Sequence, residues 1–254
     1  MTAGRTALAT AGTAHSAGIV ITSSTPLWYI TRATGLVAMV LLTISMALGL
    51  LSSVGYERPA LPRFVTVGLH RNSSLLALVF TAVHVAAAVA DGYVPIPVQD
   101  AFVPFISSYR PIWLGLGAIA SDLLLALTIT SLLRSRMSYR TWRAVHWTSY
   151  ACWPVALVHG LGTGSDTPVR WVLLLTLLCA GVVTALVSWR LTVGWPAHRL
   201  ARTAGALALV LALVAGGAWL AAGPLKTGWA QRAGTAPGLL NHAVGPLRDP
   251  GVTG

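Results

Sequence analysis

Four histidines lie inside strongly apolar segments of the sequence, two on each of two segments. His70 and His84 stand near the ends of the run LHRNSSLLALVFTAVHV, residues 69–85, and His146 and His159 share a later run. Ionisable side chains are costly inside a membrane and are usually functional there. A neutral imidazole binds iron well, and two axial imidazoles leave no open position on a haem iron, which favours electron transfer over oxygen chemistry. The four residues therefore predict two His–His ligand pairs.

The composition places these histidines in a membrane protein. The chain has 254 residues, of which 55% are hydrophobic and only 9% charged, and its mean hydropathy is +0.72. A soluble domain of this length usually carries far more charge. The formal net charge of +11 raises the alternative of nucleic-acid binding, but the cations gather in short loops between apolar runs, as in membrane proteins. We therefore expect the lipid bilayer, and no nucleic acid, as a partner.

The elements that must position the histidines are six apolar runs, each long enough to cross about 30 Å of hydrocarbon as a helix. They cover residues 27–53, 67–90, 111–133, 142–163, 169–192 and 203–223. The predicted fold is an all-α, polytopic bundle of six transmembrane helices. The predicted domains are a flexible tail (1–26), a helical core (27–192), a loop with the sixth helix (193–223) and a second tail (224–254).

Basic residues set the predicted orientation of the bundle. Cations gather in three alternate connections, at 54–66, 134–141 and 190–202. The intervening connections carry Asp91, Asp100 and Asp166 beside only two arginines. Because cytoplasmic loops of membrane proteins are enriched in Lys and Arg, the first set is predicted to be cytoplasmic. Both termini are then outside the cell membrane.

The depths of the four histidines pair them. In this orientation the second and fourth spans run in parallel, with His70 and His146 near their inner ends and His84 and His159 about 21 and 20 Å further out. On a regular helix His84 returns to within about 40° of His70, but His159 lies about 140° from His146. We expect a kink or a π-bulge near Pro154 to correct the second phase. A lone histidine in such a segment would more often be a packing residue. Four histidines at matching depths in two parallel spans make that alternative weak.

Four other polar groups are candidates for a supporting role. Arg32 falls near the outer end of the first span, where it either pairs with a haem propionate or reaches the interface. Arg71 and Arg143 are candidates for the same role at the inner pair. Asp122 is the only acid deep in a predicted helix; it either relays protons, orients a ligand imidazole or makes a structural bond.

The spacings of 14 and 13 residues, with WRAVHWTSY opening the second histidine segment, resemble ferric reductase-like transmembrane domains. That superfamily includes NADPH oxidases, ferric-chelate reductases and the bacterial haem subunit of the methionine sulfoxide reductase system. The resemblance covers about residues 28–190, and RATG, TSLLRSRMSYRTWRAVH and HGLGTGSD look like its actinobacterial branch. It implies two b-type haems, an inner one held by His70 and His146 and an outer one held by His84 and His159.

The expected function is a multi-pass cytochrome of the bacterial cytoplasmic membrane, the oxidoreductase subunit of a reductase system. Catalytic family members append flavin and nicotinamide domains, whereas a sixth helix and a tail follow the core here. The resemblance therefore implies a separate electron donor, either a flavoprotein or another redox protein, or a quinol. The alternatives are a quinol-linked cytochrome b of the b561 type, a haem-free transporter with histidines in its pathway, and a haem-free structural subunit.

Overall fold

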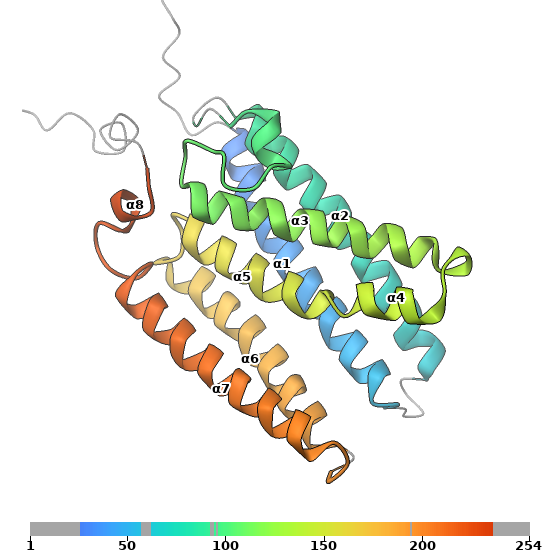
Figure 1. Ribbon diagram of the computed structural model, residues 1–254. Coiled ribbons are helices and arrows are strands. Elements are labelled where there is room, and N and C mark those ends of the chain that lie inside the picture. Colours follow the sequence, from blue (N-terminus) through green and yellow to red (C-terminus); the bar gives the residue numbers. More distant parts are fainter. Residues whose placement is uncertain (1–25, 57–61, 92–93, 95, 194, 236–254) are drawn as a thin grey trace, which may run out of the picture.

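The computed structural model describes residues 26–56, 62–91, 94, 96–193 and 195–235. Residues 1–25 of the first predicted tail and 236–254 of the second lie outside this part of the chain. The described residues form helices and connections and contain no strand (Figure 1). The predicted all-α fold is confirmed.

Five helices match predicted spans and are long and apolar enough to cross a membrane. They are α1 (Pro26–Ser53), α2 (Arg63–Ala90), α3 (Pro111–Leu132), α6 (Arg170–Thr192) and α7 (Arg199–Ala222). Three short elements lie in the connections: η1 (Val98–Ala101), η2 (Arg134–Arg136) and α8 (Trp229–Arg232). Each long helix is apolar around most of its circumference, as expected where one face meets other helices and the rest meets lipid.

The fourth predicted span, 142–163, is not one helix. It consists of α4 (Tyr139–His146) and α5 (Ser149–Thr163), with a turn at Trp147 and Thr148 between them. Pro154 has no N–H to donate to the carbonyl four residues earlier, which weakens the first turns of α5. Because their lengths are about 12 and 22 Å, neither helix alone spans the hydrocarbon, but Figure 1 shows α4 continuing roughly the line of α5.

The interior of the bundle is built by small and apolar side chains. Helix α1 packs along α2 and also contacts α5 and α6, while α3 packs on α5. One buried cluster joins Leu124 and Leu127 of α3 to Cys152 of α5, and a second joins Trp153 to Cys179 and Val183 of α6. Helix α7 lies beside α6 at the edge of the bundle (Figure 1). The histidine-bearing helices α2, α4 and α5 are therefore held by α1 and α3.

Candidate cofactor-binding site

The four apolar-segment histidines meet in two pairs. The ring centres of His70 and His146 are 6.2 Å apart, with an angle of 77° between the ring planes. Those of His84 and His159 are 6.3 Å apart, at 84°. Helix α2 supplies one ring to each pair, and α4 and α5 supply the other two. The structure therefore brings together the residues that the sequence pairs by depth.

The break between α4 and α5 explains how His159 comes to face the same side as His146. On a regular helix the 13 residues from His146 to His159 leave these rings about 140° apart. The backbone N–H groups of Thr148, Tyr150 and Ala151 donate to carbonyls three residues earlier, at 2.9, 3.1 and 2.9 Å. Such tight turns rotate the chain by about 120° per residue instead of about 100°. The extra rotation has the sign that carries His159 towards the face of His146.

Three of the four rings are anchored through Nδ1 to a backbone carbonyl. His70 donates to Ser45 O at 2.9 Å and His84 donates to Thr31 O at 2.7 Å, both on α1. His159 donates to Trp113 O on α3 at 2.8 Å. A carbonyl only accepts, so Nδ1 must carry the proton and Nε2 keeps its lone pair. This is the arrangement by which proteins orient metal-binding histidines.

His146 is the exception. Its Nδ1 is buried and has no hydrogen-bond partner in the described part of the chain, and the same holds for Nε1 of Trp142. The two rings stack, with centres 4.8 Å apart and planes at 18°. An aromatic neighbour, rather than a carbonyl, sets the orientation of this ring.

Glycines make room for the anchored rings. A Cβ atom on Gly35 would lie 3.0 Å from His84, and one on Gly49 would lie 3.3 Å from His70. On α3, a Cβ on Gly117 would lie 2.4 Å from Cε1 of His159. The α1 glycines are 14 residues apart, the same spacing as the histidines of α2. That matched spacing is a signal of the two sites that the sequence itself carries.

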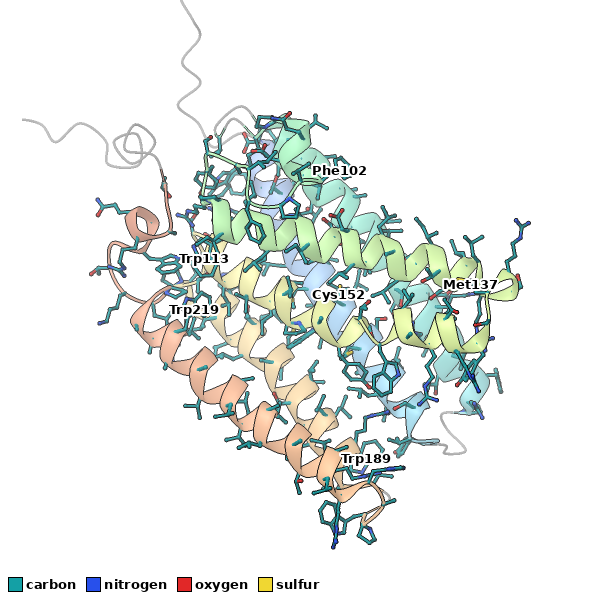
Figure 2. The ribbon with its side chains drawn as sticks, in the orientation of Figure 1. Phe102, Trp113, Met137, Cys152, Trp189 and Trp219 are labelled. Atoms are coloured by element: carbon teal, nitrogen blue, oxygen red, sulfur yellow. The ribbon has the colours of Figure 1, made fainter. Side chains whose placement is uncertain are left out.

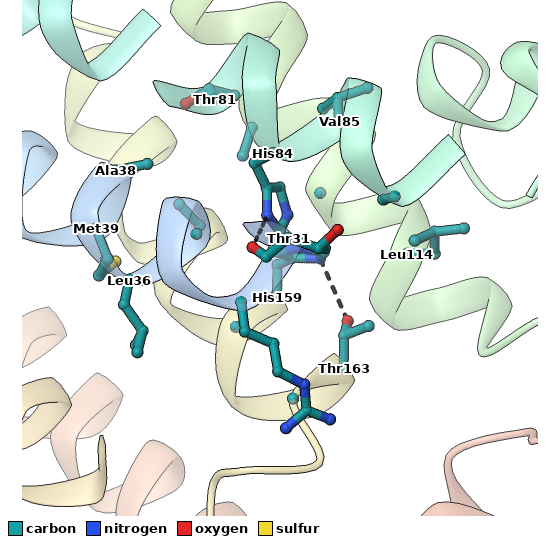
Figure 3. Close-up of a pocket in the computed structure, with 18 of the residues that line it drawn as sticks. Thr31, Leu36, Ala38, Met39, Thr81, His84, Val85, Leu114, His159 and Thr163 are labelled. Atoms are coloured by element: carbon teal, nitrogen blue, oxygen red, sulfur yellow. Dashed lines mark hydrogen bonds between the residues drawn. The ribbon is translucent and has the colours of Figure 1, made fainter. Parts of the chain in front are cut away.

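A cavity of about 350 Å³ surrounds the His84–His159 pair (Figure 3). Its walls are largely apolar and include Ala38, Met39 and Leu114. The cavity also reaches polar groups at this end of the bundle, including Asp100, Tyr109 and Ser165. Two of these, Asp100 and Tyr109, come from the connection 91–110.

The three predicted cations differ in their surroundings. Arg32 lines the cavity, forms an ion pair with Asp166 and donates to Ser165 Oγ at 2.9 Å. Arg71 and Arg143 are exposed beside the other pair. Asp122 does not line the cavity, although its neighbour Ser121 does.

Sequence reasoning missed Arg110, a buried cation at the start of α3 that is only 3% exposed. Its guanidinium donates to Thr163 O at 2.7 Å, at the end of α5, and to Thr235 Oγ1 at 2.9 Å. Burial, with a smaller contribution from the nearby charge of Arg32, lowers the pKa of Arg110 from its ordinary value. Arginine stays protonated in proteins, so a fixed positive charge joins three segments here. In the sequence, only its position at the end of the connection 91–110 marks it.

The described residues contain no cluster of three or more His, Cys, Asp or Glu side chains that could hold a metal ion. Two facing imidazoles therefore make up each candidate site. They can supply two axial nitrogens to a flat macrocycle that carries its own four.

Comparison with curated proteins and with solved structures gives no match. The model of one protein family, described as "Ferric reductase like transmembrane component", matches residues 34–158. This range includes His70, His84 and His146 and ends one residue before His159. Together with the helical bundle and its paired histidines, the match shows that residues 34–158 of this chain belong to the ferric reductase-like transmembrane family.

Proposed function

We propose that this protein is a b-type cytochrome that carries electrons across the membrane between two haems. His70 and His146 hold the inner haem, and His84 and His159 hold the outer one. Family membership supports the coarser part of this proposal, a membrane component of a redox system. The finer part rests on one observation, which is the matched separation of the two histidine pairs.

The ring separations fit a shared metal ion. Two metal–nitrogen bonds of about 2 Å each, plus about 1.1 Å from each nitrogen to its ring centre, place the ring centres about 6 Å apart. The distances in the two pairs are 6.2 and 6.3 Å. A haem held there by the two histidines of a pair would supply a one-electron carrier.

The protein's own groups prepare both positions. The carbonyls of Ser45, Thr31 and Trp113 hold three rings with Nε2 free to bind iron. The apolar walls of the outer cavity suit a largely hydrocarbon ring, and its volume is in the range of about 300–1,000 Å³ that is usual for ligand pockets. Arg32, on the same cavity, is the cation that we assign to an outer propionate, in exchange for part of its pairing with Asp166. We assign Arg71 and Arg143 to the inner propionates.

We propose that the electron donor is separate from the described residues. A nicotinamide-binding domain of the usual kind needs a parallel sheet, and the described part of the chain contains no strand. We propose a separate flavoprotein, another redox protein or a quinol as the donor.

Haem content tests the central proposal. A reduced-minus-oxidised spectrum of the purified protein, with haem quantified per chain, should give two b-type haems. A protein purified intact without haem would overturn the proposal and leave a transporter or a structural subunit as the function.

Orientation is tested separately. Positive-inside bias puts the connections at 134–141 and 190–202 in the cytoplasm. A cysteine placed within 236–250 should react with an impermeant reagent in intact cells. Protection of that cysteine, with labelling only after lysis, would reverse the assignment of inner and outer haem.

A further inference from the structure

Three tryptophans from distant parts of the chain meet at the end of the bundle that holds the His84–His159 pair. Trp113 lies at the start of α3, Trp219 in the last turn of α7, and Trp229 in α8. The ring centre of Trp113 is 5.2 Å from the ring centre of Trp219 and 5.3 Å from that of Trp229. Figure 2 shows Trp113 and Trp219 side by side near α8. We call these three residues the tryptophan cluster.

The segment that follows α7, residues 224–235, packs beside this cluster and is held there by hydrogen bonds. Pro224 is fully buried, and Ala233 is only 4% exposed. Trp229 Nε1 donates to Gly162 O, in the last turn of α5, at 3.0 Å. The backbone N–H of Arg110 donates to Gly234 O at 3.1 Å, and its side chain reaches Thr235. Residues 224–235 therefore form hydrogen bonds both to the start of α3 and to the end of α5.

These two helix ends hold His159. The carbonyl that accepts from its Nδ1 belongs to Trp113, whose ring is part of the tryptophan cluster. Gly162 and Thr163 follow His159 on the final turn of α5. A Cβ on Gly162 would lie 2.3 Å from the Trp113 ring, so the two helix ends are in close contact and leave no room for a larger side chain.

From this geometry we propose that Trp229, with segment 224–235, is a positioning element for the outer haem ligand His159. It acts through the carbonyl of Trp113 and the last turn of α5, and none of its residues is among those that line the cavity. The segment lies outside the family match at 34–158. The inference rests on the proposed function, because it assigns a role towards the outer haem.

The test compares two tryptophans at the same end of the bundle in the full-length protein. Trp229→Ala removes a cluster ring and the donor to Gly162 O. Trp171→Ala removes a ring that is 61% exposed at the start of α6. Loss of a group that orients a metal ligand typically lowers metal affinity by about 10–100-fold. Trp229→Ala should therefore weaken outer-haem binding about tenfold and change its electron paramagnetic resonance signal, while the inner-haem signal stays as in the wild type. Trp171→Ala should change neither.

Two milder variants keep the test decisive if Trp229→Ala does not fold. Trp229→Phe keeps an aromatic ring but removes the hydrogen bond to Gly162 O, and Thr235→Val removes the acceptor for Arg110 at nearly constant volume. Each should shift the potential and the signal of the outer haem alone. Unchanged outer-haem spectra in both variants, or equal changes at both haems, would overturn the positioning role. A wild-type protein without haem would instead overturn the proposed function, so the two failures are distinguishable.

Discussion

The two histidine pairs have nearly equal ring separations, but they are held in different ways. In the His84–His159 pair both rings donate to backbone carbonyls and both lie against a glycine. In the His70–His146 pair only His70 is fixed in this manner. His146 ends a short helix, leaves Nδ1 unpartnered within the described residues, and stacks on Trp142.

A pair of ligands can therefore be placed by rigid helices or by an adjustable junction. His159 sits on a continuous helix whose end is gripped by α3 and the segment after α7. His146 sits on α4, which the turn at 147–148 separates from α5. We therefore expect a change beside His146 to be absorbed locally, and a change beside His159 to meet closely packed neighbours.

The largest expected effect comes from removing the ligands themselves. His84→Ala and His159→Ala should each lose about half of the haem and the same component of a redox titration, because a metal site with one of its axial ligands missing binds weakly. His70→Ala and His146→Ala should remove the other component. His198→Asn, at an exposed position with φ 54° that asparagine tolerates, is the control and should change nothing. If His84→Ala and His159→Ala deplete different components, the pairing across the helices is wrong.

A methyl group beside a rigid ring should have the next largest effect. Gly117→Ala would place Cβ 2.4 Å from Cε1 of His159, and overpacking of this kind costs about 1–3 kcal/mol. The outer haem should be lost or its potential shifted. Gly49→Ala, with Cβ 3.3 Å from His70, should disturb the inner haem less. Gly181→Ala adds the same methyl in open space. Haem titrations of the three proteins check this order, and equal effects of Gly117→Ala and Gly181→Ala would contradict it.

A smaller and selective effect is expected at the adjustable site. Trp142→Leu removes the ring that stacks on His146, a contact of about 0.5–1.5 kcal/mol. The inner-haem signal should broaden or shift while the outer one is unchanged. Trp171→Leu is the matched control, since Trp171 is 61% exposed at the start of α6. An outer-haem change in Trp142→Leu would mean that the two sites are not independent.

The smallest effect on haem chemistry is expected at Trp153, which lies between the two pairs along the chain. It packs against Cys179 and Val183 of α6 and donates from Nε1 to Thr43 Oγ1 at 3.0 Å. This placement favours a packing role over an electron bridge. Trp153→Leu should therefore lower stability but leave the rate of electron transfer between haems unchanged, as measured by flash photolysis. A clear slowing would assign the indole to the electron path.

Much of the fold was predictable because its signals belong to residue types. Long apolar runs specify α1, α2, α3, α6 and α7, since the charged side chains in them are too few to prevent a membrane crossing. The division of the fourth span into α4 and α5 could be predicted only in part. The phase of His159 demanded a distortion, but periodicity does not locate it.

Residue order predicts two histidine pairs at two levels of a helical bundle, because helix rise follows from the number of residues between them. How each ring is held follows from the packing of the helices. Three of the rings are anchored by backbone carbonyls, a group that every residue carries. The residue types of Thr31, Ser45 and Trp113 therefore do not predict that they hold these rings. The burial of Arg110 and the meeting of Trp113, Trp219 and Trp229 depend on contacts between segments far apart in the chain. Such contacts exist only once the helices have packed.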